Sequence, residues 1–537
     1  MRSASPVTGR GAAPERRRTA LSAAQAALCG MGLAVSAREH PDRLALASSH
    51  GDRSFDLLNA RANQLARALR ARGLGEGDGV ALLCANRPEF VVAFLATLRA
   101  GMRLVPIHTG LRTGEIRYVV EDCGARALLA DGRFADAAAG AARGLARIDV
   151  RIGIGDPVHG FEAFDDAVDA ESGDDLDDPV LGSQMPYTSG TTGRPKGVFR
   201  PPAGALRQPA LADAMRRFGY GARGDVHLCT GPLHHTAPLV FSLAMPLGCG
   251  VPVVLMDGFD AERALRLVDA YRVTHTHMVP VMFRRLLELP DEERACRDVS
   301  SLRVVLHGAA PCPPSIKRRM IEWLGPVLFE YYAAAEGFGC LATSEEWLAR
   351  PGTVGRPAPG DVEIRDGEGK SLPPGQEGVI FLRAPEGGRF AYHGDEPMTR
   401  AAYAGDLFTL GDVGVLDAGG YLYVRERSAD VVEAGGMNVY PAEVDAVLVT
   451  HPAVRDAATV GVPDDAGGER VVGVVELADG HVASAALADE LAALCRAELA
   501  AFKCPREIVF RAALPRLENG KIYRRVVRDE VRAARAR

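Results

Sequence analysis

Short apolar runs alternate with amphipathic stretches between Asp78 and Glu336, and this alternation limits the fold more than any other property of the chain. Runs such as 80–84 and 328–332 are rich in aliphatic or aromatic residues, whereas 261–273 carries apolar residues three and four positions apart. Strands that alternate with helices are typical of parallel sheets covered by helices. We therefore predict an α/β fold with layered, largely parallel sheets.

The size and composition of the chain indicate a globular protein with more than one domain. Its 537 residues exceed what one ordinary hydrophobic core accommodates. The apolar fraction of 47% and the charged fraction of 25% are typical of soluble proteins, and a net charge of −6 gives no indication of nucleic-acid binding. Residues 165–178 hold eight acidic and no basic side chains, and we predict that they form a solvated loop.

The basic residues are unusual, because only five of the 63 are lysines. Together with the many alanines, glycines and prolines, this excess of arginine indicates a GC-rich genome, as in an actinomycete-like bacterium. Lysine and arginine are not interchangeable where a compact, mobile ammonium group is needed. Lys196 and Lys521 are therefore candidate functional residues.

The ten cysteines are scattered without any CxxC pair, which indicates a reduced, cytoplasmic protein and neither a disulfide framework nor a zinc site. His275 and His277 lie on one face of a predicted strand, and without a third ligand in view we expect core or near-site histidines. We expect residues 1–18 to be a disordered basic tail that precedes a first helix. No strictly apolar run of 18 residues exists, so no membrane-spanning segment is predicted.

The strongest motif is YTSGTTGRPKGV at 187–198, which follows a predicted strand. Glycines free backbone N–H groups to wrap phosphates, hydroxyl groups add donors, and a lysine adds a movable charge. The motif does not fit the Walker pattern, because Gly197 follows the lysine. We predict a phosphate-binding loop whose candidate residues are Thr188, Ser189, Gly190, Thr191, Thr192 and Lys196.

With this loop the chain resembles the adenylate-forming superfamily, which comprises acyl-CoA synthetases, peptide-synthetase adenylation domains and luciferases. The resemblance extends from about residue 24 to 530 and includes six motifs in family order. It implies a large, multi-sheet N-terminal domain at 19–428 that binds AMP and the acid. It also implies a small, mobile α+β C-terminal domain at 429–537 that rotates between two half-reactions.

The same resemblance implies a nucleotide site. Gly308, Ala309 and Ala310, in HGAAP, would lie along adenine. In EYYAAAEG, Tyr332 would stack on adenine and Glu336 would hold Mg²⁺.

Further residues are implied to serve the two half-reactions. Asp412, in FTLGD, would bind the ribose hydroxyls, and Arg427 would lie near the ribose at the hinge. Lys521 would reach the carboxylate and the α-phosphate during adenylation, whereas Gly435 and Gly436 would line the pantetheine tunnel.

The implied gate of the acid pocket is His235, in PLHH. The residues beside this gate indicate the branch of the superfamily. Amino-acid adenylating domains offer an aspartate near this gate, but no acidic residue adjoins His234 and His235. No carrier domain follows Lys521 either, so the expected substrates are ATP, CoA and a carboxylic acid that is a small molecule. The small residues Ala333–Ala335, Gly337 and Gly339 leave room for a bulky or hydrophobic acid, such as one from natural-product metabolism.

One departure from the family pattern leaves the mechanism open. Ala333 and Ala335 stand where the family has glycine and threonine, and the threonine hydroxyl donates to the α-phosphate side of the nucleotide. A lost charge-assisted hydrogen bond costs roughly 1.5–3 kcal/mol. The alternative to a two-step ligase is therefore an adenylation-impaired enzyme that converts an acyl-adenylate supplied by a separate upstream enzyme. A pseudoenzyme that only binds nucleotide or acyl-adenylate is a third hypothesis.

Overall fold

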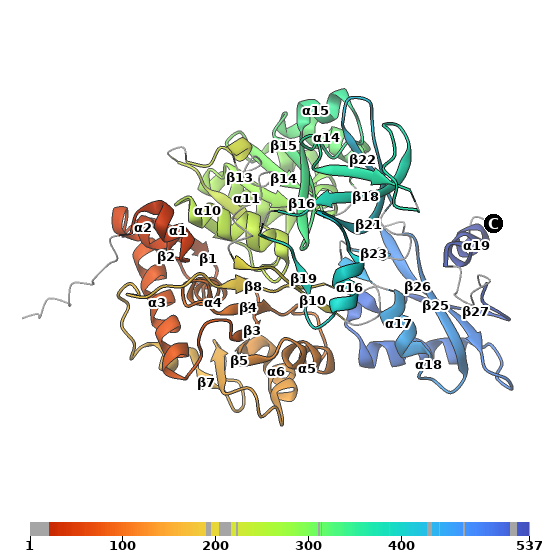
Figure 1. Ribbon diagram of the computed structural model, residues 1–537, viewed down its shortest axis with the longest axis horizontal. Helices are drawn as coiled ribbons and strands as arrows, with labels where there is room; N and C mark the ends of the chain where they lie inside the picture. The colour runs from red at the N-terminus through yellow and green to blue at the C-terminus, as the bar shows by residue number, and fades with distance from the viewer. Residues whose placement is uncertain are drawn as a thin grey trace, which may run out of the picture.

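The computed structural model shows two large parallel sheets, a third antiparallel sheet and a separate C-terminal α+β unit (Figure 1). The described residues are all except 1–20, 189–194, 203–215, 222–223, 310–311, 313, 367, 386, 427–431, 436, 440, 465–467, 516–523 and 536–537. The expected tail at 1–18 and the expected boundary between Ser428 and Ala429 therefore lie outside the described residues.

The first sheet has six strands in the order β7-β6-β5-β3-β4-β8, and all neighbours run parallel. Its strands are β3 (Gly79–Leu83), β4 (Arg103–Pro106), β5 (Ala125–Asp131), β6 (Val150–Ile154), β7 (Glu162–Ala163) and β8 (Ser183–Gln184). On one face it packs against α5 (Thr113–Asp122) and α6 (Ala135–Ala142).

The second sheet has eight strands in the order β16-β15-β14-β13-β11-β12-β1-β2, parallel except at its two edges. Its strands are β1 (Leu44–Ser48), β2 (Arg53–Ser54), β11 (His227–Cys229), β12 (Val253–Leu255), β13 (His275–Met278), β14 (Val304–His307), β15 (Leu328–Ala334) and β16 (Gly337–Thr343). Helices α11 (Ala261–Tyr271), α12 (Pro280–Leu287) and α14 (Pro314–Leu324) share a core with it.

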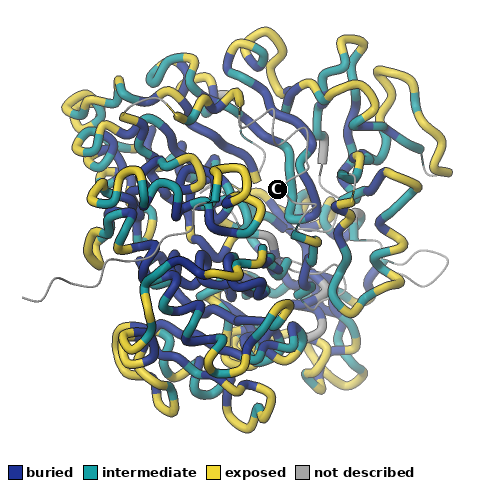
Figure 2. The backbone as a smooth tube through the Cα atoms, turned by 60° about the vertical axis from the view of Figure 1, so that its left-hand side comes forward, coloured by how far each residue is buried: buried dark blue, intermediate teal, exposed yellow. Residues whose placement is uncertain are grey.

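Helices α3 (Phe55–Ala71) and α4 (Pro88–Arg99) lie between the two sheets and form one core with both. The first begins where the Ser54 side chain accepts from the Leu57 N–H group, and its apolar positions recur at helical spacing. Figure 2 shows these inner layers as buried and the connecting loops as exposed. The expected layered, largely parallel α/β architecture is confirmed.

The third sheet is antiparallel and consists of β17 (Val362–Arg365), β18 (Glu377–Arg383), β20 (Tyr403–Ala404), β21 (Leu407–Leu416) and β22 (Leu422–Glu426). The C-terminal unit follows with the hairpin β23 (Val432–Ala434) and β24 (Met437–Val439). Its core is formed by α17 (Pro441–Leu448), β25 (Val454–Pro463), β26 (Glu469–Leu477), α18 (Ala485–Glu498) and β27 (Glu507–Arg511). Figure 1 shows α19 (Arg524–Arg535) at the outer side of this unit.

The acidic stretch at 165–178 is in part the solvated loop that we predicted, because the side chains of Asp165, Asp169 and Asp178 are exposed. It begins within α7 (Phe164–Val168) and lies along α3, where Arg61 pairs with Asp165 at 2.9 Å. Asp175 is 5% exposed and accepts a hydrogen bond of 2.8 Å from the Asn59 amide group. The burial of Asp175 was not predicted, because the amide group that binds it comes from a distant segment.

All ten cysteines are free, as expected, and no helix in the described part of the chain is long and apolar enough to cross a bilayer.

Candidate functional site

A cavity of about 1260 Å³ lies where the two parallel sheets, the third sheet and the C-terminal unit meet. Its walls include residues that follow the carboxyl ends of β4, β11, β13 and β14. The carboxyl edge of parallel strands is where α/β folds place their ligands, because the loops there are free to vary. The cavity is therefore the candidate site.

Two of the predicted nucleotide residues meet in the structure. The Tyr332 hydroxyl, near the end of β15, donates to Oδ2 of Asp412 on β21 at 2.6 Å. Ala309 follows β14 in the left-handed region at φ 66°, where a residue other than glycine is strained by roughly 1–2 kcal/mol. A Cβ atom at Gly308 would lie 2.7 Å from the Tyr331 ring, so only glycine fits there. These positions are compatible with the expected adenine and ribose contacts.

Lys196 begins β10 (Lys196–Phe199), whose partner β9 (Tyr187–Thr188) brings Thr188 opposite the lysine. The ammonium group lies 3.6 Å from a carboxylate oxygen of Asp395 and close to Met398. The hairpin therefore presents the two described ends of the phosphate loop to the cavity. The remaining loop candidates, Ser189, Gly190, Thr191 and Thr192, lie outside the described residues, as does Ala310.

Glu336 is 8% exposed, lines the cavity, and accepts a hydrogen bond of 3.0 Å from the Tyr392 hydroxyl. A carboxylate oxygen is the ligand type that Mg²⁺ prefers, so this residue fits the expected metal role. Beside it, Arg200 donates to the backbone carbonyls of Ala335, at 3.2 Å, and of Glu336. Burial lowers the pKa of this guanidinium group. Arg200 was not among the predicted site residues.

Phe241, Tyr331 and Phe338 line one part of the cavity, which we call the aromatic chamber. Phe241, on the π-helix η2 (Pro238–Ala244), lies 4.9 Å from the Tyr331 ring and 6.4 Å from the Phe338 ring, measured between centroids. The Tyr331 hydroxyl forms a hydrogen bond of 2.9 Å with Nε2 of His277, whose pKa is lowered to about 3 by burial. As expected, His277 is a buried residue beside the site. Ala333 also lines the chamber and leaves space beside the aromatic rings.

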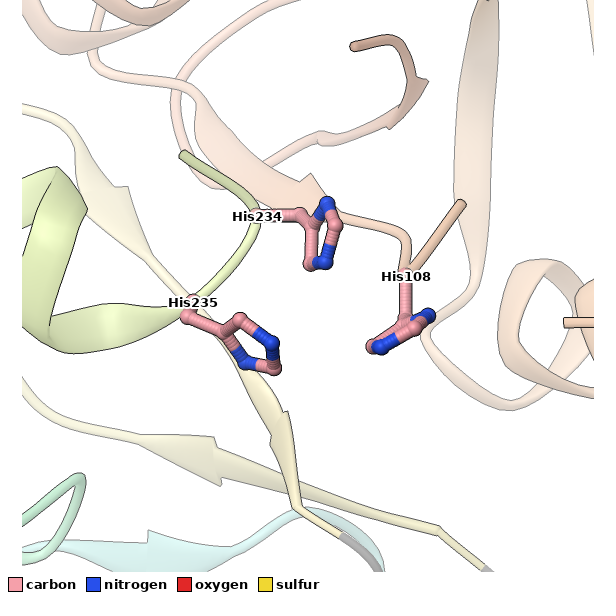
Figure 3. Close-up of side chains that lie close together, drawn as sticks. All are labelled: His108, His234 and His235. Carbon is pink, nitrogen blue, oxygen red and sulfur yellow. The ribbon is translucent and has the colours of Figure 1, made fainter. Parts of the chain in front are cut away.

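His235, the expected gate, lies in a cluster with His234 and His108 (Figure 3). The His108 ring centroid is 4.4 Å from that of His234 and 5.2 Å from that of His235. Burial is the main cause of a lowered pKa in all three, to about 3 for His108 and about 4 for His235. These imidazoles are therefore neutral near pH 7. His108 had not been predicted, because a lone histidine after a strand carries no local signal.

The C-terminal unit forms one wall of the cavity. Gly435, at the turn of the β23–β24 hairpin with φ 62°, and Met437 both line it. Phe502 and Lys503 also line it, and the Phe502 ring lies 4.9 Å from that of His108. Three other predicted residues of this region, Arg427, Gly436 and Lys521, lie outside the described residues.

Comparison with known proteins is consistent with this geometry. Residues 33–389 match the model of the AMP-binding enzyme family, and residues 443–521 match the AMP-binding enzyme C-terminal domain. The indoleacetate–CoA ligase of Aromatoleum aromaticum is 31% identical over 91% of this chain and 96% of the relative. A feruloyl-CoA synthase of an Amycolatopsis species is 33% identical over 92% of this chain and 96% of the relative.

One solved enzyme, the o-succinylbenzoate CoA synthetase of Bacillus subtilis, is similar in two forms. A double mutant bound with a product analogue, OSB-NCoA, has a TM-score of 0.80 at 28% identity, covering 93% of this chain and 98% of that one. The complex with the acyl-adenylate OSB-AMP has a TM-score of 0.63 at the same identity, covering 92% and 97%. The relatives come from varied bacteria, so the expected actinomycete-like origin stays a prediction.

Proposed function

Because the chain belongs to the AMP-binding enzyme family, we propose that it is an acid–thiol ligase that joins a bulky hydrophobic carboxylic acid to coenzyme A through an acyl-adenylate. The observation that carries this proposal is the set of residues that line one cavity. The candidate nucleotide residues Thr188, Lys196 and Ala309 line the same cavity as the aromatic chamber and Gly435 of the C-terminal wall.

The proposed reaction has two steps. A carboxylate oxygen of the acid attacks the α-phosphorus of ATP, and the bond to pyrophosphate breaks. The CoA sulfur then attacks the acyl carbon, and AMP leaves with the bonding electron pair. Lys196 and Arg200 supply positive charge on the cavity wall, and positive charge placed where phosphate charge accumulates lowers the barrier. Glu336 would hold Mg²⁺, which neutralises phosphate charge when it is bound.

The chamber supports an aromatic acid as the substrate class. Phe241, Tyr331 and Phe338 offer ring faces and edges within stacking distance of one another. Small side chains at 333–335 leave the space between them open. The names of two relatives, indoleacetate–CoA ligase and feruloyl-CoA synthase, favour the same class.

The position of the C-terminal unit supports a state that serves the second step. The β23–β24 hairpin faces the cavity, as a CoA-lining loop should. The similarity to the solved synthetase is also higher for the form with the CoA product analogue than for the acyl-adenylate complex. Domains at 19–428 and 429–537 that rotate between the steps remain part of the proposal.

The test is mass spectrometry of the products from the full chain with ATP, Mg²⁺, CoA and a panel of aromatic and straight-chain acids. Formation of an acyl-CoA together with AMP supports the proposal. If neither an acid nor a synthetic acyl-adenylate gives a thioester, the proposal is wrong and the pseudoenzyme hypothesis is favoured.

A second candidate function is favoured by the backbone at Ala335. The side chain of this residue has no hydroxyl group, where the family pattern has a hydroxyl donor, and its carbonyl group accepts from Arg200. An enzyme with a weak first step would convert an acyl-adenylate made by a separate enzyme. The same assay separates the two functions, because this enzyme would form a thioester only from the supplied acyl-adenylate.

A further inference from the structure

Three histidines that follow strands of two different sheets converge at the wall of the cavity. His108 lies two residues beyond the end of β4 in the six-stranded sheet, whereas His234 and His235 lie between β11 and the helix η2. One nitrogen atom of each ring lies within 4.8 Å of the others. Figure 3 shows the three rings directed toward a common point.

The chemistry of the cluster suits a metal ion. A metal ligand must offer a lone pair, and each neutral imidazole has one nitrogen that offers it. His234 is 9% exposed, and its Nε2 atom has no hydrogen-bond partner within the described part of the chain. A buried polar atom without a partner is costly, so an ion bound there would remove a penalty.

We propose that His108, His234 and His235 bind one divalent transition-metal ion of the zinc class. Three imidazole nitrogens with one open position form a ligand set that Zn²⁺ accepts, and imidazole also suits Cu²⁺ and Ni²⁺. This site is separate from the expected Mg²⁺ site at Glu336, because hard Mg²⁺ prefers oxygen ligands. All three histidines line the cavity, so the open position faces the substrates.

Two neighbours oppose binding and limit its strength. The Gly110 N–H group donates to Nδ1 of His108 at 2.9 Å. A neutral imidazole has one lone-pair nitrogen, so the ion replaces this hydrogen bond. The charge of Lys503 also acts on His108, but Glu115 and Glu443 lie 2.7 Å from its ammonium group and offset that charge.

The bound ion would inhibit the proposed ligase, and this consequence rests on the proposed function. Thiolate is a strong ligand for Zn²⁺, and carboxylate is also accepted. An ion with an open position in the cavity would therefore capture the CoA thiol or the acid before reaction. Inhibition by Zn²⁺ should appear with Mg²⁺ in excess.

Metal binding is tested on the full chain without a histidine tag, after removal of metals. Calorimetry with Zn²⁺ should show one site, and Co²⁺ should give the visible bands of a four-coordinate ion. His108→Gln and His234→Gln should each weaken binding by at least about 100-fold, because removing a ligand costs more than disturbing an outer-shell partner. The matched control is His481→Gln, an exposed histidine outside the cluster.

Equal affinity in His108→Gln and in the control would overturn the proposal, and so would the absence of a site in the wild-type protein. Circular dichroism of each variant shows whether a loss of Zn²⁺ affinity is caused by misfolding. The binding result is independent of the proposed function, because it requires no turnover. A chain that binds Zn²⁺ but forms no thioester would contradict only the ligase assignment.

Discussion

The ammonium nitrogen of Lys503 lies 2.7 Å from Oε1 of Glu115, although 388 residues separate them in the chain. Lys503 also lies 2.7 Å from Oε1 of Glu443 in the C-terminal unit, and its side chain is 3% exposed. The Arg112 side chain adds a hydrogen bond of 3.1 Å to the Leu499 carbonyl. These contacts join α5 to the C-terminal unit at the edge of the cavity.

Glu115→Gln should slow thioester formation while leaving adenylation intact, because the contact exists in the arrangement that we assign to the second step. Removing one partner of a buried ion pair costs about 3–5 kcal/mol, and the remaining pair with Glu443 reduces this cost. We expect a loss of about tenfold in thioester formation from a supplied acyl-adenylate. The control is Glu121→Gln on the same helix, which breaks a half-exposed pair with Arg117. Equal effects of the two variants would contradict the role of Glu115.

Phe241→Leu should reduce the preference for aromatic acids. The ring contacts that it removes are worth about 0.5–1.5 kcal/mol, which corresponds to roughly two- to tenfold in kcat/KM. The measurement compares kcat/KM for an aromatic acid and for a straight-chain acid in the wild-type and variant enzymes. Phe218→Leu is the matched control, because Phe218 is buried against Phe241 but does not line the cavity. An unchanged ratio of the two kcat/KM values would show that the chamber does not determine which acid the enzyme prefers.

In the metal-free protein, the burial of the three histidines predicts a loss of stability in mild acid. Burial holds the pKa of His235 at about 4 and of His108 at about 3, whereas an unfolded histidine titrates near 6.5. As the pH falls from about 6.5 to 4, the unfolded chain therefore binds protons at these histidines while the folded chain does not. Proton binding favours the unfolded state, so the free energy of unfolding decreases over this range. Each histidine contributes about 1 kcal/mol per pH unit in that window. His108→Gln should make the urea midpoint less sensitive to pH between 7.5 and 5 than in the wild-type protein.

Lys521→Ala should abolish acid-dependent pyrophosphate exchange and leave thioester formation from a synthetic acyl-adenylate largely intact. The prediction rests on the resemblance, which assigns this lysine to the first step only. Stopped-flow or quenched assays of each half-reaction measure the two rates separately. Comparable losses in both assays would show that the residue has another role.

The sheets and helices could be predicted because their signals are local. The apolar run at 80–84 overlaps β3, and the run at 328–332 lies within β15. The periodic stretch at 261–273 contains α11. The nucleotide motifs could be located for the same reason, since each is a short run of residues. Tyr332 and Asp412 could be identified singly, but their hydrogen bond depends on how β15 and β21 come together.

Arg200 and His108 could not be predicted, because each acts through partners distant in sequence. The carbonyl group that Arg200 contacts is 135 residues away, and nothing near the arginine indicates it. His108 gains its partners only when the two parallel sheets place their carboxyl edges side by side. The burial of Asp175 could not be predicted for the same reason, since its partner Asn59 is 116 residues away.

The final prediction concerns Ala333 and Ala335, and it decides between the two candidate functions. If the alanines limit adenylation, the wild-type enzyme gives little pyrophosphate exchange but converts a synthetic acyl-adenylate and CoA to the thioester. Ala335→Thr, alone or with Ala333→Gly, should then raise exchange by about ten- to a hundredfold, because one charge-assisted hydrogen bond is regained.

Arg200 makes this test sharper, because its guanidinium group already lies on the cavity wall and is held by the Ala335 carbonyl. If Arg200 supplies the donor that Ala335 lacks, the wild-type enzyme shows robust exchange with its own acid. Arg200→Gln then lowers exchange, and Ala335→Thr restores part of it in the double variant. If Arg200 supplies neither this donor nor charge to the phosphates, Arg200→Gln leaves the exchange rate per folded enzyme unchanged while Ala335→Thr still raises it. Thioester formation from the supplied acyl-adenylate serves as the internal control, since it reports folding and CoA binding without the first step.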